Sequence, residues 1–250
     1  MINMIGELAV HIEGRSIPQI VITDVRIGDE LEILKEYYFS SEDMYSDFFN
    51  EHNEMLKENL NKLELSASYD FEDKVKLIRT LALRTHRNSF YVSCLSKYEM
   101  LLKEICLILI KERELNVKIK NREFSLKRGF QLIKTHIDAN ILQGIEEYSI
   151  LENFVELRNC IVHRDARLDH DEMKLYLSDN INDDFLLFIK NYEHVSLILN
   201  RIEIHPKCIR ELINTLSSFF QVLCEKIRIQ LHDPYHYKML EIIKQFKSAN

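Results

Sequence analysis

Residues 146–163 read EEYSILENFVELRNCIVH, and this stretch combines an apolar helical pattern with three polar side chains of interest. Its apolar residues recur at the spacing of one helix face: Ile150, Leu151, Phe154, Leu157 and Ile161. The spacing predicts a helix from about Glu146 to His163 that packs this face into a core. Arg158, Asn159 and His163 lie among the core-facing positions. Because burying polar groups unpaired costs free energy, we expect these three side chains to have partners or a chemical role.

The spacing of the three polar residues limits how they can act together. Asn159 and His163 are four residues apart and share one face of the expected helix. Arg158 and His163 are five apart, which is about 140° around the axis by ~100° per residue, so their side chains do not stack. They converge through the length of the arginine, where the helix ends near His163, or across a symmetric dimer. We favour the last two together.

The residue types indicate a specific chemistry. His163 is suited to be a general acid or base near neutral pH. Arg158 is a permanent cation whose planar fork suits phosphate oxygens. Metal-independent RNA cleavage needs a group that takes the proton of the ribose 2′-hydroxyl, a group that protonates the leaving 5′-oxygen, and a cation that stabilises the phosphorane. The alternative is a structural Arg–His pair satisfied by a carboxylate such as Glu156 or Asp165.

This stretch resembles the HEPN superfamily of helical nucleotide-binding and RNase domains. The family carries Arg, a polar residue, three or more others and then His near the end of its third core helix, and residues 158–163 fit that pattern. Residues 90–102, FYVSCLSKYEMLL, resemble the aromatic–acid–x–x–Leu signature of its first core helix at Tyr98 and Glu99. The resemblance covers roughly residues 85 to 230. Asp165 stands where the toxin branch paired with nucleotidyltransferase antitoxins has a tyrosine, so control by tyrosine modification is not expected.

The resemblance implies a mainly α fold, a HEPN-like helical bundle with a small N-terminal β-hairpin and helical extension. It implies a homodimer in which two motif helices face each other and share one cleft. His163 would be the general acid or base, Arg158 would bind and stabilise phosphate, and Asn159 would orient His163 or hold RNA. Supporting roles would fall to Arg164 and Arg167 as further phosphate contacts, and to Glu99 as a partner of Arg158 or His163.

The function implied by the resemblance is a metal-independent endoribonuclease that leaves a 2′,3′-cyclic phosphate and a 5′-hydroxyl. Its context would be a prokaryotic toxin or anti-phage effector with RNA as substrate, no cofactor and no metal, and an antitoxin or regulator as a further partner. The alternative is a catalytically inactive HEPN-like module that binds nucleotides or RNA, or one that mediates protein interactions.

The composition indicates long helices, because 250 residues contain only five glycines and three prolines. No stretch reaches eighteen consecutive apolar residues, and no basic segment followed by an apolar run begins the chain, so we expect neither a membrane span nor a signal peptide. The five cysteines are dispersed, which suits reduced core cysteines in a cytoplasmic protein. A net charge of −7 argues against a general nucleic-acid coat protein, although the basic segments 74–87 and 118–134 can line one directed groove.

The chain divides by pattern into residues 1–73 and residues 74–250. In the first part, β-branched residues within 7–25 flank a turn at 14–16 and predict a small β-hairpin. Residues 29–73 contain fourteen Asp and Glu against three Lys and predict an acidic helical segment. That segment is either an ordinary solvated face, or an arm that screens a nucleic-acid site or docks a partner.

Further elements of the second part follow from periodicity and from helix start signals. The pattern predicts helices over about 88–113, 124–140, 181–192, 206–230 and from Asp233–Pro234 onward, and strand-like segments at 173–177 and 195–204. His232 and His236 have a spacing that metals use, but no third ligand accompanies them. Six other histidines are expected to be isolated surface or capping residues: His11, His52, His136, His170, His194 and His205. His86, between Arg84 and Arg87, could reach a phosphate, although nothing else singles it out.

Overall fold

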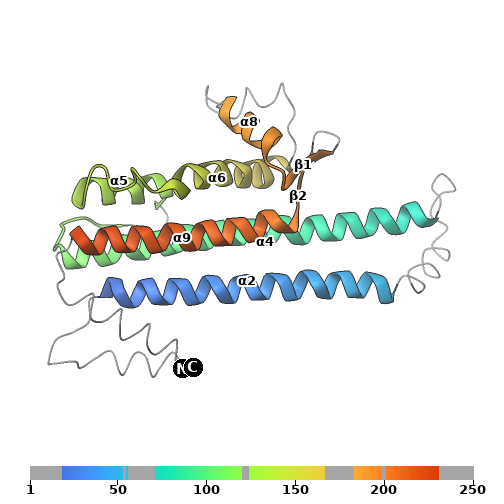
Figure 1. The fold of residues 1–250 in the computed structure, drawn as a ribbon, viewed down its shortest axis with the longest axis horizontal. Coiled ribbons are helices and arrows are strands. Elements are labelled where there is room, and N and C mark those ends of the chain that lie inside the picture. The colour runs from blue at the N-terminus through green and yellow to red at the C-terminus, as the bar shows by residue number, and fades with distance from the viewer. Residues whose placement is uncertain are drawn as a thin grey trace. The chain divides into compact units, whose positions relative to one another are not determined.

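The computed structural model describes residues 19–52, 55, 71–119, 124–166, 183–198 and 201–230. Within these ranges the chain is mainly helical, which confirms the expected fold class (Figure 1). The helices are α2 (Gln19–Glu51), α4 (Phe71–Glu112), α5 (Leu126–His136), α6 (Glu146–Arg164), α8 (Asp183–Asn191) and α9 (Pro206–Gln230). The strands β1 (Val195–Ile198) and β2 (Arg201–Ile204) form an antiparallel hairpin in which Val195 pairs with Ile204.

Contacts between residues divide the chain into two compact units. The first unit comprises residues 1–31, 98–148 and 216–250, and the second comprises residues 32–97 and 149–215. Helices α2, α4 and α9 each contribute residues to both units. The division into domains at residues 73 and 74 stays a prediction, as does the likeness of the bundle to HEPN domains.

Helix α2 corrects the expected N-terminal hairpin. Residues 19–25, read from the sequence as part of a strand, are the first turns of α2. Ile20, Thr23, Ile27 and Leu31 are each at most 3% exposed, and they recur three or four residues apart. Burial along one helix face outweighs the modest strand preference of β-branched residues. Residues 7–18 of the expected hairpin lie outside the described ranges, and the expected acidic helix is confirmed over residues 29–51.

Helix α4 begins earlier than expected. It was predicted to start at Asn88, but it runs without interruption from Phe71 to Glu112 and is the longest helix among the described residues. Asparagine and serine favour helix caps, yet the seventeen residues before Asn88 contain neither glycine nor proline to end a helix. Ser89 is an ordinary helical residue, whose carbonyl accepts a hydrogen bond from Ser93 Oγ at 2.8 Å.

The other elements agree with the sequence pattern. Helices α5, α6, α8 and α9 and the hairpin β1–β2 lie where helices or strands were predicted, and α5 ends at His136 rather than near residue 140. Pro206 is the first residue of α9, where a missing N–H group costs nothing. The expected strand at 173–177 and the expected helix after Pro234 lie outside the described ranges.

The core of the first unit is built from aromatic rings of α4, α5 and α9. Tyr98, on α4, is 1% exposed, and its ring centroid lies 5.7 Å from Phe219 and 5.5 Å from Phe220, both edge-on. Phe130 of α5 lies 6.0 Å from Phe219 in the same geometry. Edge-to-face pairs add a favourable quadrupole interaction to the burial of each ring. The aromatic cluster therefore joins the consecutive helices α4 and α5 to α9, which comes much later in the sequence.

Helix α5 approaches α4 closely at Gly129, and this contact predicts the effect of a substitution. A Cβ at Gly129 would lie 2.8 Å from Phe124 Cζ and 2.9 Å from Leu102 Cδ2, whereas a Cβ at Gly28 in α2 would meet nothing within 4 Å. Gly129→Ala should lower the free energy of unfolding, because overpacking costs about 1–3 kcal/mol and outweighs the gain in helix propensity. Gly28→Ala is the control and should stabilise by about 0.5–1 kcal/mol. Urea denaturation measures both, and equal stabilisation by the two changes would contradict the close approach.

The core of the second unit surrounds α6. Leu151, Phe154 and Leu157 are at most 1% exposed. The backbone carbonyl of Phe154 accepts a hydrogen bond from the hydroxyl of Tyr91 on α4 at 2.9 Å, and the Phe154 ring lies 5.9 Å from that of Tyr192. This bond ties α6 to α4 in the part of the helix that leads to Arg158.

The prediction for the cysteines is confirmed, and the predictions for two of the histidines have opposite outcomes. All five cysteines are free and buried, which confirms their expected place in the core. His205 is a capping residue as expected, since its Nδ1 accepts a hydrogen bond from Lys207 N at 3.3 Å. The prediction for His194 was wrong, because its side chain is buried against Glu211.

Among the described residues, no helix has both the length and the apolar character needed to cross a membrane.

Candidate active site at the end of helix α6

The end of α6 exposes His163 to solvent. The sequence placed His163 among core-facing positions, and the structure corrects this. By ~100° per residue, His163 lies about 120° around the axis from the fully buried Leu157, and its side chain is exposed. His163 makes no hydrogen bond or ion pair with any described residue. Ile150, also expected in the core, is 42% exposed.

Arg158 and Asn159 are brought together. The Nη1 of Arg158 donates a hydrogen bond to Asn159 Oδ1 at 3.2 Å, and both side chains are half-buried. Adjacent residues do not face each other on a helix, so this contact depends on the length of the arginine side chain. It holds the guanidinium against Asn159, one residue further along α6. The structure does not bring Arg158 into hydrogen-bonding contact with His163 within one chain.

The turn that follows His163 has an uncommon backbone conformation. Asp165 and Ala166 have φ values of 49° and 60°, in the left-handed region that non-glycine residues rarely adopt. Ala166 N donates to Cys160 O at 3.2 Å, and Ala166 O accepts from Ile202 N of β2 at 2.7 Å. Left-handed residues of this kind cost of order 1–3 kcal/mol each and persist only where the surroundings hold them. The hairpin β1–β2 therefore holds the turn directly after His163.

Arg201 of β2 is a residue that the sequence pattern did not single out. Its Nη2 lies 2.9 Å from Asp165 Oδ2, so a second cation is placed beside the end of α6. The Arg201 side chain is 25% exposed and that of Asp165 is 72% exposed. No local signal marks Arg201, because the contact depends on how β2 packs against the turn. Figure 1 shows the hairpin next to the C-terminal end of α6.

The turn gives a prediction that separates charge from backbone conformation. Asp165→Asn should change the free energy of unfolding by at most about 1 kcal/mol, because an exposed ion pair contributes little. Asparagine also tolerates the left-handed conformation, whereas Asp165→Val should destabilise clearly more, because a β-branched residue is strained there. Urea denaturation of both variants measures the difference. Equal stability of the two variants would show that the turn is not held in this conformation.

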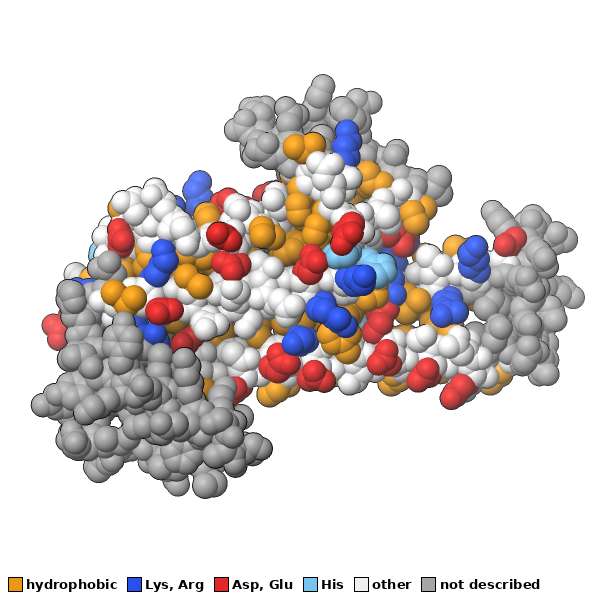
Figure 2. Space-filling view, viewed as in Figure 1, with side chains coloured by type: hydrophobic (Ala, Val, Ile, Leu, Met, Phe, Trp, Pro, Cys, Tyr) orange, Lys and Arg blue, Asp and Glu red, His pale blue; other side chains and the backbone are white. Residues whose placement is uncertain are grey.

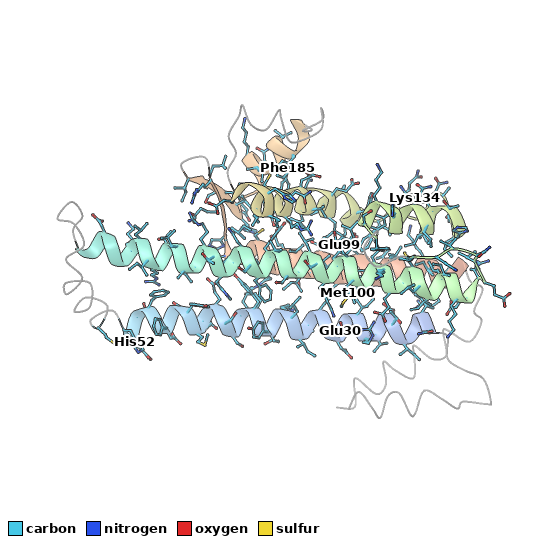
Figure 3. The ribbon with its side chains drawn as sticks, turned by 180° about the vertical axis from the view of Figure 1, so that it is seen from behind. Glu30, His52, Glu99, Met100, Lys134 and Phe185 are labelled. Atoms are coloured by element: carbon cyan, nitrogen blue, oxygen red, sulfur yellow. The ribbon has the colours of Figure 1, made fainter. Side chains whose placement is uncertain are left out.

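The roles of the remaining predicted site residues, Glu99, Arg164 and Arg167, stay predictions. Glu99 lies half-buried on α4 in the first unit (Figure 3), so its pairing with Arg158 or His163 stays a prediction. Arg164 is the last residue of α6, but its side chain is not described, and Arg167 lies outside the described ranges. Across the described residues, no group of three or more His, Cys, Asp or Glu side chains is placed to hold a metal ion.

A second polar cluster in this unit is structural. His194 Nε2 lies 2.9 Å from Glu211 Oε1, and the Tyr192 hydroxyl donates to Glu211 Oε2. Burial raises the pKa of the Tyr192 hydroxyl, and burial raises the pKa of the Cys208 thiol to about 12, so neither group is a nucleophile near neutral pH. His205 N donates to His194 O at 3.0 Å, which joins the cluster to the base of the hairpin. Figure 2 shows histidine side chains beside basic and acidic ones at the start of α9.

Known proteins offer no match from which a function could be inferred for this chain. No family model matches the chain, and no curated protein and no solved structure matches it. Membership of the HEPN superfamily therefore stays a prediction from residues 90–102 and 158–163. The function has to be argued from the geometry at the end of α6.

Proposed function

We propose that the protein is a metal-independent endoribonuclease of the HEPN type, acting as a toxin or anti-phage effector on RNA. The observation that carries the proposal is the exposed imidazole of His163, which follows Arg158 by five residues on the same helix. The backbone strain at Asp165 and Ala166 gives further support, because such strain gathers at functional sites. A histidine exposed beside a rigidly held turn is accessible to a large substrate and has little freedom to move its backbone.

The reaction follows from the two side chains. The 2′-oxygen of a ribose attacks the adjacent phosphorus and loses its proton to a general base, while the bond from phosphorus to the 5′-oxygen breaks and that oxygen gains a proton from a general acid. His163 supplies one of these proton transfers. Arg158 donates hydrogen bonds to the phosphorane oxygens. In this proposal Asn159, whose Oδ1 accepts a hydrogen bond from Arg158, also holds the guanidinium, in addition to orienting His163 or holding RNA.

A second copy of the chain supplies the other proton transfer. One imidazole cannot serve as base and acid on opposite sides of the same phosphate. In a homodimer with facing α6 helices, one His163 takes the proton from the 2′-hydroxyl and the partner subunit's His163 protonates the 5′-oxygen. Arg164 and Arg167 would contact neighbouring phosphates. The active site in this proposal is therefore composite.

The test compares an RNA oligonucleotide with the same sequence carrying 2′-deoxyribose, each incubated with the purified protein in excess EDTA. We expect the RNA to be cut and the 2′-deoxy strand to remain intact, because the attacking hydroxyl is missing. Cleavage of both strands would contradict attack by the 2′-oxygen. Binding of RNA without cleavage would favour the nucleotide- or RNA-binding module, and absence of binding would favour the protein-interaction module.

A further inference from the structure

Helix α2 has a second apolar face that the fold does not use. Four large apolar side chains of α2 in the second unit are exposed: Ile33 64%, Tyr37 64%, Met44 62% and Phe48 44%. By ~100° per residue, all four fall within an arc of about 60°, and we call this arc the α2 ridge. Tyr38 and Phe49, which face the core, lie on a different side of the helix and are at most 7% exposed. A contiguous exposed apolar stripe of this kind marks an interaction surface.

The aromatic members of the α2 ridge are held in place. Tyr37 stacks on Phe90 of α4, with ring centroids 6.1 Å apart and 27° between the planes. Phe48 stacks on His52 at the end of α2, with centroids 4.5 Å apart and 20° between the planes (Figure 3). Side chains that are already ordered lose little conformational entropy when a partner binds. Tyr37 and Phe48 are therefore suited to anchor an interface.

Acidic side chains line one edge of the α2 ridge. Four exposed carboxylates lie on that edge of α2: Glu32, Glu36, Asp43 and Asp47. The one basic residue of α2 within the second unit is Lys35, whose Nζ already lies 3.0 Å from Glu32 Oε1. Figure 2 shows acidic side chains spread along α2. The ridge thus combines an apolar stripe with a strongly negative border.

The apolar stripe and its negative border favour some binding partners over others. RNA and anionic lipid surfaces carry negative charge and would be repelled. A second copy that packed antiparallel on the same ridge would place one row of carboxylates against another, which is unfavourable, and a parallel copy would bring no basic residue to the acidic edge. A partner with lysine or arginine beside an apolar stripe would satisfy both parts of the surface. From residue 33 to residue 48 the ridge extends about 22 Å at 1.5 Å per residue, the length of a helix of about four turns.

We propose that the α2 ridge is the docking site for a basic amphipathic helix of another protein. The apolar stripe of that helix lies on Tyr37, Met44 and Phe48, and its lysine or arginine side chains face Glu36, Asp43 and Asp47. The proposal does not rest on RNA cleavage, because the ridge shares no residue with the end of α6. The sequence left two functional roles open for the acidic segment at residues 29–73, screening a nucleic-acid site or docking a partner. The proposal assigns the second of these roles to α2.

The test uses full-length protein and a synthetic peptide of fifteen residues, with leucine at helical spacing and lysine along one flank. A peptide with glutamate in place of lysine and a scrambled peptide of equal composition are the matched probes. We expect the basic peptide to bind wild-type protein. The affinity should fall at least tenfold for the double variant Tyr37→Gln/Met44→Gln, because the two changes remove apolar surface and leave the net charge of α2 unchanged. Met44→Gln alone should weaken binding as well, and Leu187→Gln on α8, another exposed apolar position, should leave it unchanged. Calorimetric titration measures each affinity.

Several results would overturn the proposal. Binding of the scrambled peptide as tightly as the amphipathic one, or unchanged binding to Tyr37→Gln/Met44→Gln, would mean that charge alone attracts the peptide. Failure of the basic peptide to bind wild type would also overturn it. Sedimentation of the protein as a dimer that the ridge substitutions dissociate would assign the ridge to a second copy instead. Melting curves of the variants confirm that they are folded.

Discussion

His163→Ala should lower the rate of RNA cleavage by roughly 10²–10⁴-fold, the usual contribution of a positioned general acid or base. The same change should leave the melting temperature within about 2 °C of wild type, because substitutions of exposed side chains seldom change stability by more than ~0.5 kcal/mol. A discontinuous cleavage assay with labelled RNA gives the rate, and thermal unfolding followed by circular dichroism gives the stability. Loss of activity without loss of stability would identify His163 as part of the chemistry.

The matched control for His163 is His136→Ala, which removes a histidine from the end of α5 in the first unit. Cleavage should be unaffected by this change. Arg158→Lys gives a second comparison, since lysine keeps the charge but cannot offer the planar fork, and it should retain only part of the activity. If His163→Ala and His136→Ala gave equal rates, or if His163→Ala lowered stability as much as activity, His163 would be structural.

Phe154→Ala should lower the free energy of unfolding by about 3–5 kcal/mol, the usual cost of removing a large aromatic side chain from a packed core. Phe154 is 1% exposed, and its ring lies 6.3 Å from that of Tyr91, 6.0 Å from that of Phe188 and 5.9 Å from that of Tyr192. The cavity would open between α4, α6 and α8, so the surroundings can collapse only partly. The midpoint of urea denaturation measures the loss.

Ile150→Ala is the control for Phe154, because Ile150 is on the same helix and 42% exposed. It should cost less than about 1 kcal/mol, since much of the side chain is already in water. Equal losses for the two variants would contradict the packing of α6. If Phe154→Ala also reduced RNA cleavage in conditions where the protein stays folded, the position of α6 in the core would matter for the site at its end.

Elements with strong local signals were predictable from the sequence. Helix α6 lies within one residue of its predicted end, because its apolar spacing is regular and Gly144 precedes it. Helix α9 begins at Pro206, where the sequence placed its start, because proline is favoured at the first helical position. In these segments local preference and tertiary packing favour the same structure.

Elements with conflicting local signals were not predictable. Residues 19–25 contain β-branched side chains at both alternating and helical spacing. The burial of Ile20 and Thr23 within the first unit favours the helix. The start of α4 was placed at Asn88 because asparagine and serine resemble a cap, but no residue before them interrupts the helix. Local preference is weak in both segments, so tertiary contacts decide.

Arg158, Asn159 and His163 could be named as site candidates from the sequence, whereas their geometry could not. The pattern from Arg158 to His163 can be read from the sequence, while the exposure of His163 follows from which side of α6 is covered. Arg201 and the strained turn at Asp165 and Ala166 could not be found, because they depend on a hairpin that returns to α6 from later in the chain. The contact of Asn159 with Arg158 likewise depends on side-chain conformation.

The most direct measurement of the central claim is the chemistry of the RNA ends. Wild-type protein is incubated with a defined RNA in excess EDTA, and the fragments are analysed by mass spectrometry. The account predicts fragments that end in a 2′,3′-cyclic phosphate and begin with a 5′-hydroxyl, because His163 and Arg158 act on the ribose 2′-oxygen and the phosphate without a metal. Intact RNA, or fragments with 3′-hydroxyl and 5′-phosphate ends, would contradict it.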